Sequence, residues 1–179
     1  MEQVDLSSGA ASRVFVDVRS KGLVSALDHE LTFAASPDSF ALRGVDASGA
    51  IDVDVVVRVP VARFDPPEHA SRFDRDKMTD NLRGKEVLDM ARWPALVFRG
   101  RYSGTIVDGR LAGDLEVRGA PRPIALDVVV TRASDVLHVE GVWEGTLGDL
   151  GIKPYKALFG ALKLADWIRV RIAISFTRA

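Results

Sequence analysis

IDVDVVVRVPV, residues 51–61, alternates apolar and polar side chains over most of its length. Its odd-numbered positions carry Ile or Val, whereas Asp52, Asp54 and Arg58 lie at even-numbered positions. Successive side chains of a β-strand point to opposite faces, so this pattern predicts a strand with one buried and one solvated face. Strands of this kind are typical of antiparallel sheets that have one face in water.

The same rhythm recurs along most of the chain. IRVRIAISFT (168–177) and LHVEGVWEGTL (137–147) alternate as clearly as the first stretch. Weaker strand candidates, separated by turn residues, are 13–20, 30–35, 39–43, 95–102, 110–118 and 122–132. The sequence therefore predicts an all-β, antiparallel protein.

Two local elements interrupt or connect these strands. DRDKMTDNLRGKEVLDM (74–90) predicts a helix that Asp74 caps, that Gly84 divides into two short helices, and that Trp93-Pro94 ends. In IVDGRL, Asp108-Gly109 predicts a hairpin with a two-residue turn, because both residue types tolerate a positive φ. About nine strand candidates with one helical insertion favour a closed barrel of about eight strands, which leaves no free edge. A two-sheet sandwich is the alternative.

Composition narrows the classes of function. The 179 residues predict one domain, 1–179, with a net charge of −1 that offers no basic surface to nucleic acid. There is no cysteine, so disulfides, thiolate metal sites and a cysteine nucleophile are excluded. No apolar run reaches the ~18 residues of a membrane span. The amino terminus, MEQVDLSSGAASRV, lacks the pattern of a signal peptide, so we expect a cytoplasmic protein, or a periplasmic one if a signal was removed.

Four stretches, in this order, resemble the YceI family. They are SKGLVSALDHELTF (20–33), GKEVLDMARWPALVFRG (84–100), LAGDLEVRGAPRPIALDVVV (111–130) and LGDLGIKPYKALFGALKLADWIRVRI (147–172). Each is only a strand with a turn or short connection, but their order and spacing together are specific. The resemblance implies a lipocalin-like β-barrel that binds a polyisoprenoid or another lipid-like chain.

The resemblance gives the inward-facing residues a role. It implies that an apolar, elongated ligand such as an isoprenoid or a fatty acid lies inside the barrel. The sequence contains no phosphate-binding glycine loop and no metal-ligand spacing, so we expect no cofactor and no metal. The predicted ligand-binding residues are His29, Phe33, Val55, Val57, Phe98, Leu115, Val128, Trp143, Phe159 and Ile172. Two alternatives remain: a filled barrel that acts as a structural or interaction protein, in one form a homodimer, and a hydrolase-type enzyme that uses His29.

The sequence departs from the family pattern at two positions. Leu27-Asp28-His29 stands where close relatives carry His-Asp-His, and Leu150 stands where they carry an aromatic residue. The missing first histidine weakens a histidine pair that would bind metal or move protons. A hydrogen-bonded structural role near the rim is the alternative for His29. Either His29 or Arg75, from the charged cluster before the helix, is a candidate to orient the head of a ligand; capping and solvated ion pairs are the simpler interpretation of that cluster.

Residues 148–166, GDLGIKPYKALFGALKLAD, form an apolar connection before the last strand. Tyr155, Leu158, Phe159 and Leu162 follow Pro154 at helical spacing, which predicts a short helix with one apolar side. We expect this segment to close the mouth of the barrel, either as a fixed plug or as a lid with hinges at Gly151 and Gly160. Glycines at 100, 113 and 141 on the apolar faces either leave room for a ligand or permit strong bends.

Overall fold

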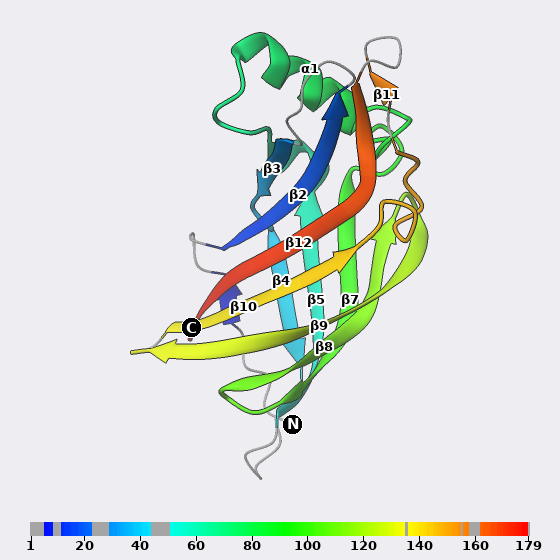
Figure 1. Ribbon diagram of the computed structural model, residues 1–179. Helices are drawn as coiled ribbons and strands as arrows, with labels where there is room; N and C mark the ends of the chain where they lie inside the picture. Colours follow the sequence, from blue (N-terminus) through cyan, green and yellow to red (C-terminus); the bar gives the residue numbers. More distant parts are fainter. Residues whose placement is uncertain are drawn as a thin grey trace.

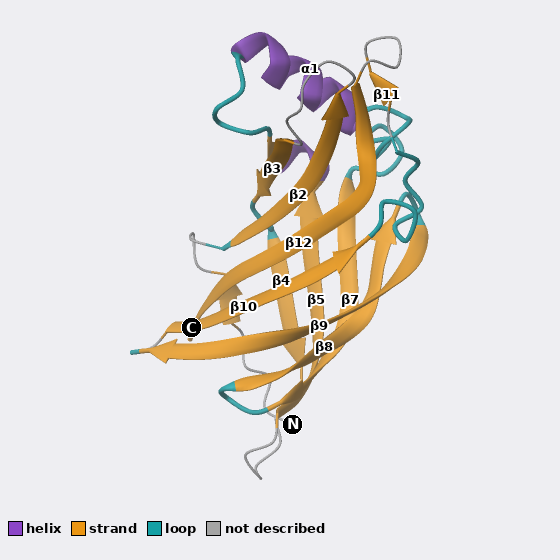
Figure 2. Ribbon diagram, viewed as in Figure 1, coloured by secondary structure: helices purple, strands orange, loops and turns teal. Residues whose placement is uncertain are grey.

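Antiparallel pairing joins the strands in nearly the order in which they occur along the chain. The computed structural model describes residues 6–8, 12–22, 29–43, 51–134, 136–154, 156–157 and 162–178. Figures 1 and 2 show a strongly curled sheet with one α-helix at one end. In these residues the elements are β1 (Leu6–Ser8), β2 (Arg13–Gly22), β3 (His29–Ala35), β4 (Ser39–Arg43), β5 (Ile51–Pro60), η1 (Val61–Arg63), β6 (Phe64–Asp65), α1 (Arg72–Arg83), β7 (Ala95–Gly104), β8 (Asp108–Val117), β9 (Ala120–Ala133), β10 (Val136–Gly145), β11 (Lys156–Ala157) and β12 (Leu162–Arg178).

The pairings close the sheet on itself. The hydrogen-bonded order is β4-β5-β7-β8-β9-β10-β12-β2-β3-β6, in which β12 pairs with β2 near the other end of the sequence. Along the chain, β3 leads into β4 after three residues, and β5 leads into β6 through the single turn η1. The β4–β5 pair at one end of the order and the β3–β6 pair at the other therefore join the same two stretches of chain, so the two ends of the order meet. The predicted antiparallel, lipocalin-like barrel is therefore confirmed. The strand segments outnumber the eight or so predicted because bends divide long strands into two segments.

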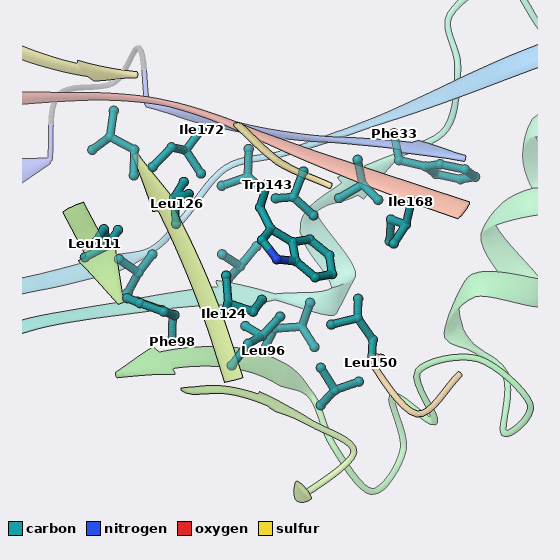
Figure 3. Close-up of a pocket in the computed structure, with 18 of the residues that line it drawn as sticks. Phe33, Leu96, Phe98, Leu111, Ile124, Leu126, Trp143, Leu150, Ile168 and Ile172 are labelled. Carbon is teal, nitrogen blue, oxygen red and sulfur yellow. The ribbon is translucent and has the colours of Figure 1, made fainter. Parts of the chain in front are cut away.

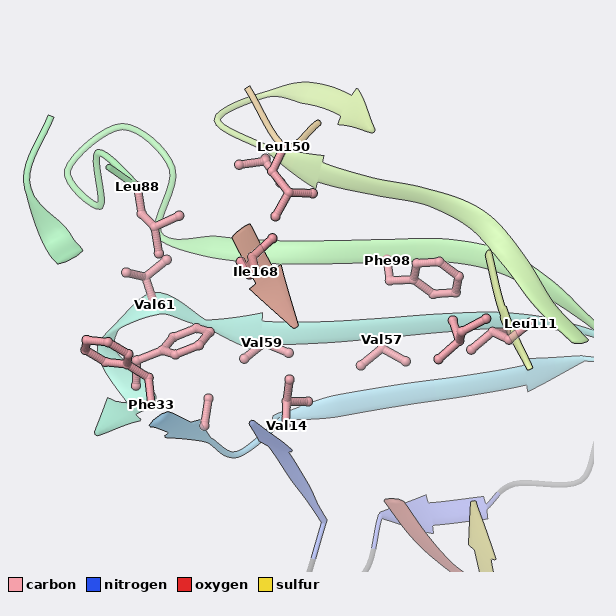
Figure 4. Packing of buried hydrophobic residues seen from close by; sticks show 14 of the residues in the cluster. Val14, Phe33, Val57, Val59, Val61, Leu88, Phe98, Leu111, Leu150 and Ile168 are labelled. Atoms are coloured by element: carbon pink, nitrogen blue, oxygen red, sulfur yellow. The ribbon is translucent and has the colours of Figure 1, made fainter. Parts of the chain in front are cut away.

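The predicted alternation places the apolar side chains inside. Val53, Val55, Val57 and Val59 of β5 are all buried, whereas the alternate residues Asp52 and Asp54 are exposed. Figure 4 shows Val57, Phe98 and Leu111 in one part of the core, with Val61, Phe33 and Leu88 near the end of the barrel that carries α1. The hydrophobic core is thus the inner surface of the barrel. In the described part of the chain, no helix has the length and hydropathy that a membrane span requires.

The helical insertion differs from its prediction at both ends. Helix α1 begins at Arg72, and its N-cap is Ser71, whose hydroxyl accepts the amide N–H of Asp74 at 3.2 Å and donates to the Asp74 carboxylate at 2.6 Å. It ends at the C-cap Gly84. Residues 85–90 form turns instead of the second helix that we predicted. Ser71 is the N-cap instead of Asp74 because an N-cap side chain accepts the amide N–H of the residue three positions later, and Asp74 occupies that later position.

The hairpin between β7 and β8 is present, but its turn is not the predicted one. Gly104 pairs with Gly109, and residues 105–107 form the turn, so that Asp108 and Gly109 both already belong to β8. The Thr105 hydroxyl accepts the amide N–H groups of Val107 and Asp108 at 3.1 and 3.2 Å. This side-chain capping satisfies the turn amides, so the left-handed backbone expected at Asp108-Gly109 is not needed.

The connection before β12 also differs from expectation. Lys156 and Ala157 form β11, which pairs with Lys163 and Leu162 of β12, so these residues are in a β-ladder and not in the predicted helix. Tyr155, Leu158, Phe159 and Gly160 lie outside the described residues. The helical spacing was misleading because backbone pairing with β12 offers Lys156 and Ala157 an alternative to a short, isolated helix.

Candidate functional site

An apolar cavity of about 650 Å³ lies inside the barrel. Figure 3 shows side chains from several strands pointing into it. Strands β2, β3, β5, β7, β8, β9, β10 and β12 all contribute, each through alternate residues. The cavity therefore follows directly from the period-two pattern, because one face of every long strand is apolar and closure turns that face inward.

Most of the predicted ligand-binding residues lie together on this cavity. The lining includes Phe33, Val55, Val57, Phe98, Leu115, Val128, Trp143 and Ile172. His29 begins β3 opposite Ser20, but its side chain is not in the described part of the structure, and Phe159 lies outside that part altogether. Arg75 belongs to α1 and does not line the cavity. Whether the lining residues bind a ligand stays a prediction.

Aromatic rings lie flat against the wall above glycines. A Cβ atom added to Gly100 would lie 2.5 Å from the Phe98 ring and 2.5 Å from the carbonyl oxygen of Ala112. A Cβ atom added to Gly145 would likewise lie 2.5 Å from the Trp143 ring. The absence of side chains at these positions lets the rings fold onto the strands instead of crossing the lumen. Glycines on the inner face thus help to keep the barrel hollow.

The polar lining residues gather mainly at the two ends of the cavity. At the end covered by α1, the lining contains Asn81 and the exposed Lys153. At the other end it contains Thr105 and the exposed Arg132, whose Nε donates to the carbonyl oxygen of Ser134 at 3.2 Å. The body of the cavity between these ends is dominated by hydrocarbon, a surface that favours an apolar occupant.

Tyr102 is a polar residue in the wall of the cavity, and its hydroxyl already has a hydrogen-bond partner within the protein. Its hydroxyl donates to the carbonyl oxygen of Thr105 at 2.5 Å. Burial raises the pKa of the Tyr102 phenol, and the nearby Asp108 carboxylate raises it further. The phenol is therefore neutral at physiological pH, and its proton is committed to the backbone.

Helix α1 and the segment after β10 close one end of the cavity. Met78 and Leu82 of α1 line it, as do Leu147, Leu150 and Ile152. The sequence pattern did not predict these five residues as part of the cavity lining. The sequence features that could have predicted them are the helical spacing of the apolar residues in α1 and the apolar residues that lie among turn residues in 147–152. The early part of the apolar connection 148–166 thus covers the end of the barrel, as expected for a plug or a lid.

Hydrogen bonds hold this closing segment in place. The Asp149 carboxylate accepts the amide N–H of Thr146 at 2.7 Å, and the Thr146 hydroxyl accepts that of Asp149 at 3.0 Å. The amide of Gly148 donates to Asp166 at 3.0 Å, which ties the start of the segment to β12. The bonds from Thr146 lower the pKa of Asp149 below its ordinary value, so the charged form that accepts these bonds persists at neutral pH.

The histidines with described side chains lie away from the cavity. His138 shares a hydrogen bond of 2.9 Å between its Nδ1 atom and the Ser175 hydroxyl, and His69 is exposed. Neither lines the cavity. Within the described ranges, no group of three or more His, Asp or Glu residues is placed to hold a metal ion.

The comparisons with known proteins agree with this architecture. A family model described as a YceI-like domain matches residues 9–176. The crystal structure of Burkholderia cenocepacia BcnA is similar, with a TM-score of 0.64, 15% identity and coverage of 93% of this chain and 96% of that chain. The Campylobacter jejuni YCEI protein is similar with a TM-score of 0.57, 14% identity and coverage of 81% and 85%. A search of curated proteins finds no match. At these identities the structural likeness establishes the fold.

Proposed function

The chain belongs to the family of YceI-like domains, and from this premise we propose that it binds an apolar, elongated ligand inside its barrel. An isoprenoid, a fatty acid or a similar lipid has the required shape and chemistry. The driving force is the burial of hydrocarbon, about 25 cal/mol per Å² of apolar area before the costs of ordering are subtracted.

The observation that carries the proposal is the apolar cavity of about 650 Å³. Pockets that hold small molecules typically enclose about 300–1,000 Å³. Well-packed cores leave few voids larger than a water molecule. An apolar space of this volume is therefore better explained as a binding site than as a packing defect.

The same observation argues against the alternatives. A structural or interaction protein with a filled barrel needs no lumen. A hydrolase needs a nucleophile or a general base that faces its substrate, and the described lining is mostly hydrocarbon between its polar ends. We therefore propose a binding or carrier protein without enzymatic activity. A cytoplasmic location and a homodimer stay predictions.

The proposal is tested by mass spectrometry of the purified protein, first under native conditions and then after organic extraction. We expect a stoichiometric, hydrophobic compound that leaves on denaturation. Ile124→Trp, which adds volume to the cavity wall, should reduce the bound fraction. The matched control is Ala125→Trp, because Ala125 is the next residue of β9 and points outward. A clean protein mass, together with no uptake of isoprenoid or fatty-acid probes, would reject the proposal.

A further inference from the structure

The turn between β7 and β8 carries two neighbouring apolar side chains that face water. Ile106 is 62% exposed and Val107 is 61% exposed. The Val107 carbonyl oxygen accepts the amide N–H of Val130 at 2.7 Å, so the turn lies beside the part of β9 where Val129 is also exposed. Figure 2 shows this turn at the end of the barrel away from α1. We call Ile106, Val107 and Val129 the apolar tip.

Hydrogen bonds fix the shape of this turn. The Thr105 hydroxyl accepts the amide N–H groups of Val107 and Asp108, and the Thr105 amide donates to the Asp108 carbonyl oxygen at 2.7 Å. The Tyr102 hydroxyl donates to the Thr105 carbonyl oxygen at 2.5 Å. These polar groups of the turn are therefore paired, and a fixed backbone presents Ile106 and Val107 to the solvent.

The apolar tip is continuous with the cavity. Ile106 is exposed to solvent and also lines the cavity, as do Thr105 and Arg132 at the same end. A hydrocarbon chain that moves from the lumen to Ile106 therefore stays in contact with apolar surface. The other end of the cavity differs, because α1 and residues 147–152 cover it.

The charges around the apolar tip suit a lipid surface. Arg132 is exposed, and it forms no ion pair with any residue of the described ranges. The carboxylate next to the turn, that of Asp108, accepts the Thr105 hydroxyl at 3.2 Å, and Asp127 is paired with Arg110. A cation beside exposed aliphatic side chains can pair with lipid phosphates while those side chains enter the bilayer.

Helix α1 offers a bilayer a poorer contact at the opposite end. Phe73 is 74% exposed, and the Lys77 ammonium lies 5.9 Å from the centre of its ring. Asp76 and Asp80 follow three and seven positions later, on the same side of the helix, and both are exposed. Their carboxylates would lose hydration and repel anionic lipids if Phe73 entered a bilayer. The charge pattern therefore favours the apolar tip over α1.

We propose that the apolar tip docks on the surface of a lipid bilayer, and that the lipid ligand passes between bilayer and lumen at this end of the barrel. The passage rests on the proposed function, whereas the docking does not. Three aliphatic side chains offer much less than the ~800 Å² per partner of a specific protein interface, but they can enter a fluid bilayer without a complementary surface. The bilayer is therefore the occupant that the tip fits.

The docking is tested by flotation with vesicles of phosphatidylcholine and phosphatidylglycerol. Val107→Asp places a charge in the apolar tip and leaves the cavity lining unchanged, so it should lower the affinity for vesicles at least about tenfold. Val142→Asp and Phe73→Asp are the matched controls, since each changes an exposed apolar residue that does not line the cavity. Both should bind vesicles as the unmodified protein does.

Several results would overturn the docking. The unmodified protein would stay free of vesicles, or Val107→Asp would bind them equally well. A loss of binding in Phe73→Asp instead would place the contact at α1. Light scattering tests a further occupant: an unmodified dimer that Val107→Asp separates into monomers would assign the tip to a second copy of the chain and overturn the docking as well.

The passage is tested with an anthroyloxy-labelled fatty acid, supplied either from vesicles that contain a quencher or from cyclodextrin. Val107→Asp should take up this probe from vesicles about tenfold more slowly than the unmodified protein. Uptake from cyclodextrin should be unchanged, because cyclodextrin delivers the probe without a bilayer. Unchanged uptake from vesicles would overturn the passage and leave the proposed function standing. Uptake by the unmodified protein from neither donor would overturn the passage and the proposed function together, while flotation would still decide the docking.

Discussion

Asp17 is the residue whose chemistry is most strongly altered by the fold. Its side chain points to the outer face of β2, yet it is 0% exposed. It accepts hydrogen bonds from Arg169 Nε at 2.8 Å, from Arg171 at 2.8 and 2.9 Å, and from Thr32 at 2.7 Å. Arg169 also pairs with Glu30. This cluster joins β12, β2 and β3, and therefore secures the seam where the two ends of the sequence meet.

The ionisation of Asp17 predicts how stability depends on pH. Burial alone would raise its pKa, but the hydrogen bonds from Arg171, Thr32 and Arg169 prevail and lower the pKa from 3.8 to about 2. Because the folded-state pKa is the lower one, this contribution is complete above about pH 4 and is lost as the pH falls toward 2. Its size is roughly 2 kcal/mol. Urea unfolding between pH 7 and pH 2 should show this loss in the unmodified protein.

Asp17→Asn separates this residue from the other carboxylates. The variant should be about 2–4 kcal/mol less stable at pH 7, because two arginines lose their buried partner, and its stability should fall less steeply between pH 4 and 2. The matched control is Asp52→Asn, which removes the exposed partner of Arg101 and should change the unfolding curve little. Parallel pH profiles for Asp17→Asn and the unmodified protein would contradict this account of the seam.

At the scale of elements, α1 is the piece that depends least on the barrel. None of its residues is fully buried, and it contacts the cavity mainly through Met78, Asn81 and Leu82. Its stability therefore relies on local interactions, of which the Ser71 cap is the clearest. Elements of this kind open locally at a lower free energy than core strands.

Ser71→Ala tests this view of α1. Loss of the cap should destabilise the helix by about 1 kcal/mol. We expect faster hydrogen exchange of the α1 amides and faster release of a bound lipid probe, with unchanged exchange in β5 and β12. Lys77→Ala, an exposed substitution on the same helix, serves as the control. Equal exchange rates in Ser71→Ala and the unmodified protein would show that packing, not capping, holds α1.

The sequence predicted elements best where their pattern repeats. The strands around Val55, Trp143 and Ile172 were found because alternation continues for many residues and the barrel reinforces it. The start of α1 and the turn at Thr105 were misplaced, because single side-chain bonds decide them. Lys156 and Ala157 were assigned to a helix because pairing with a strand several residues later leaves no local signal.

For the whole molecule, closure of the sheet encloses the lumen, and the side chains that line this lumen lack packing partners on one side. Buried side chains such as Val57, Phe98 and Leu126 pack along the wall and leave space between them. A ligand that fills the space replaces missing contacts in the folded state only, so binding must stabilise the barrel.

Removal of any bound lipid should therefore lower stability. We expect delipidated protein to regain about 2.7 kcal/mol at a free ligand concentration one hundred times the Kd. Chemical unfolding with and without added lipid measures this difference, and Ile124→Trp should show less of it than Ala125→Trp. An identical unfolding curve with saturating lipid would mean that the lumen does not accept it.

The sequence by itself determined the strand pattern, the inward face of the long strands and some of the cavity-lining residues, including Phe33, Phe98 and Trp143. These follow from local periodicity, which a chain carries without reference to distant residues. Only the tertiary structure decided that β12 pairs with β2, that the inward faces enclose a hollow, and that Ile106 belongs both to the lining of that hollow and to the exposed surface. Those features depend on contacts between residues far apart in sequence and on how completely side chains fill the enclosed volume, and periodicity specifies neither.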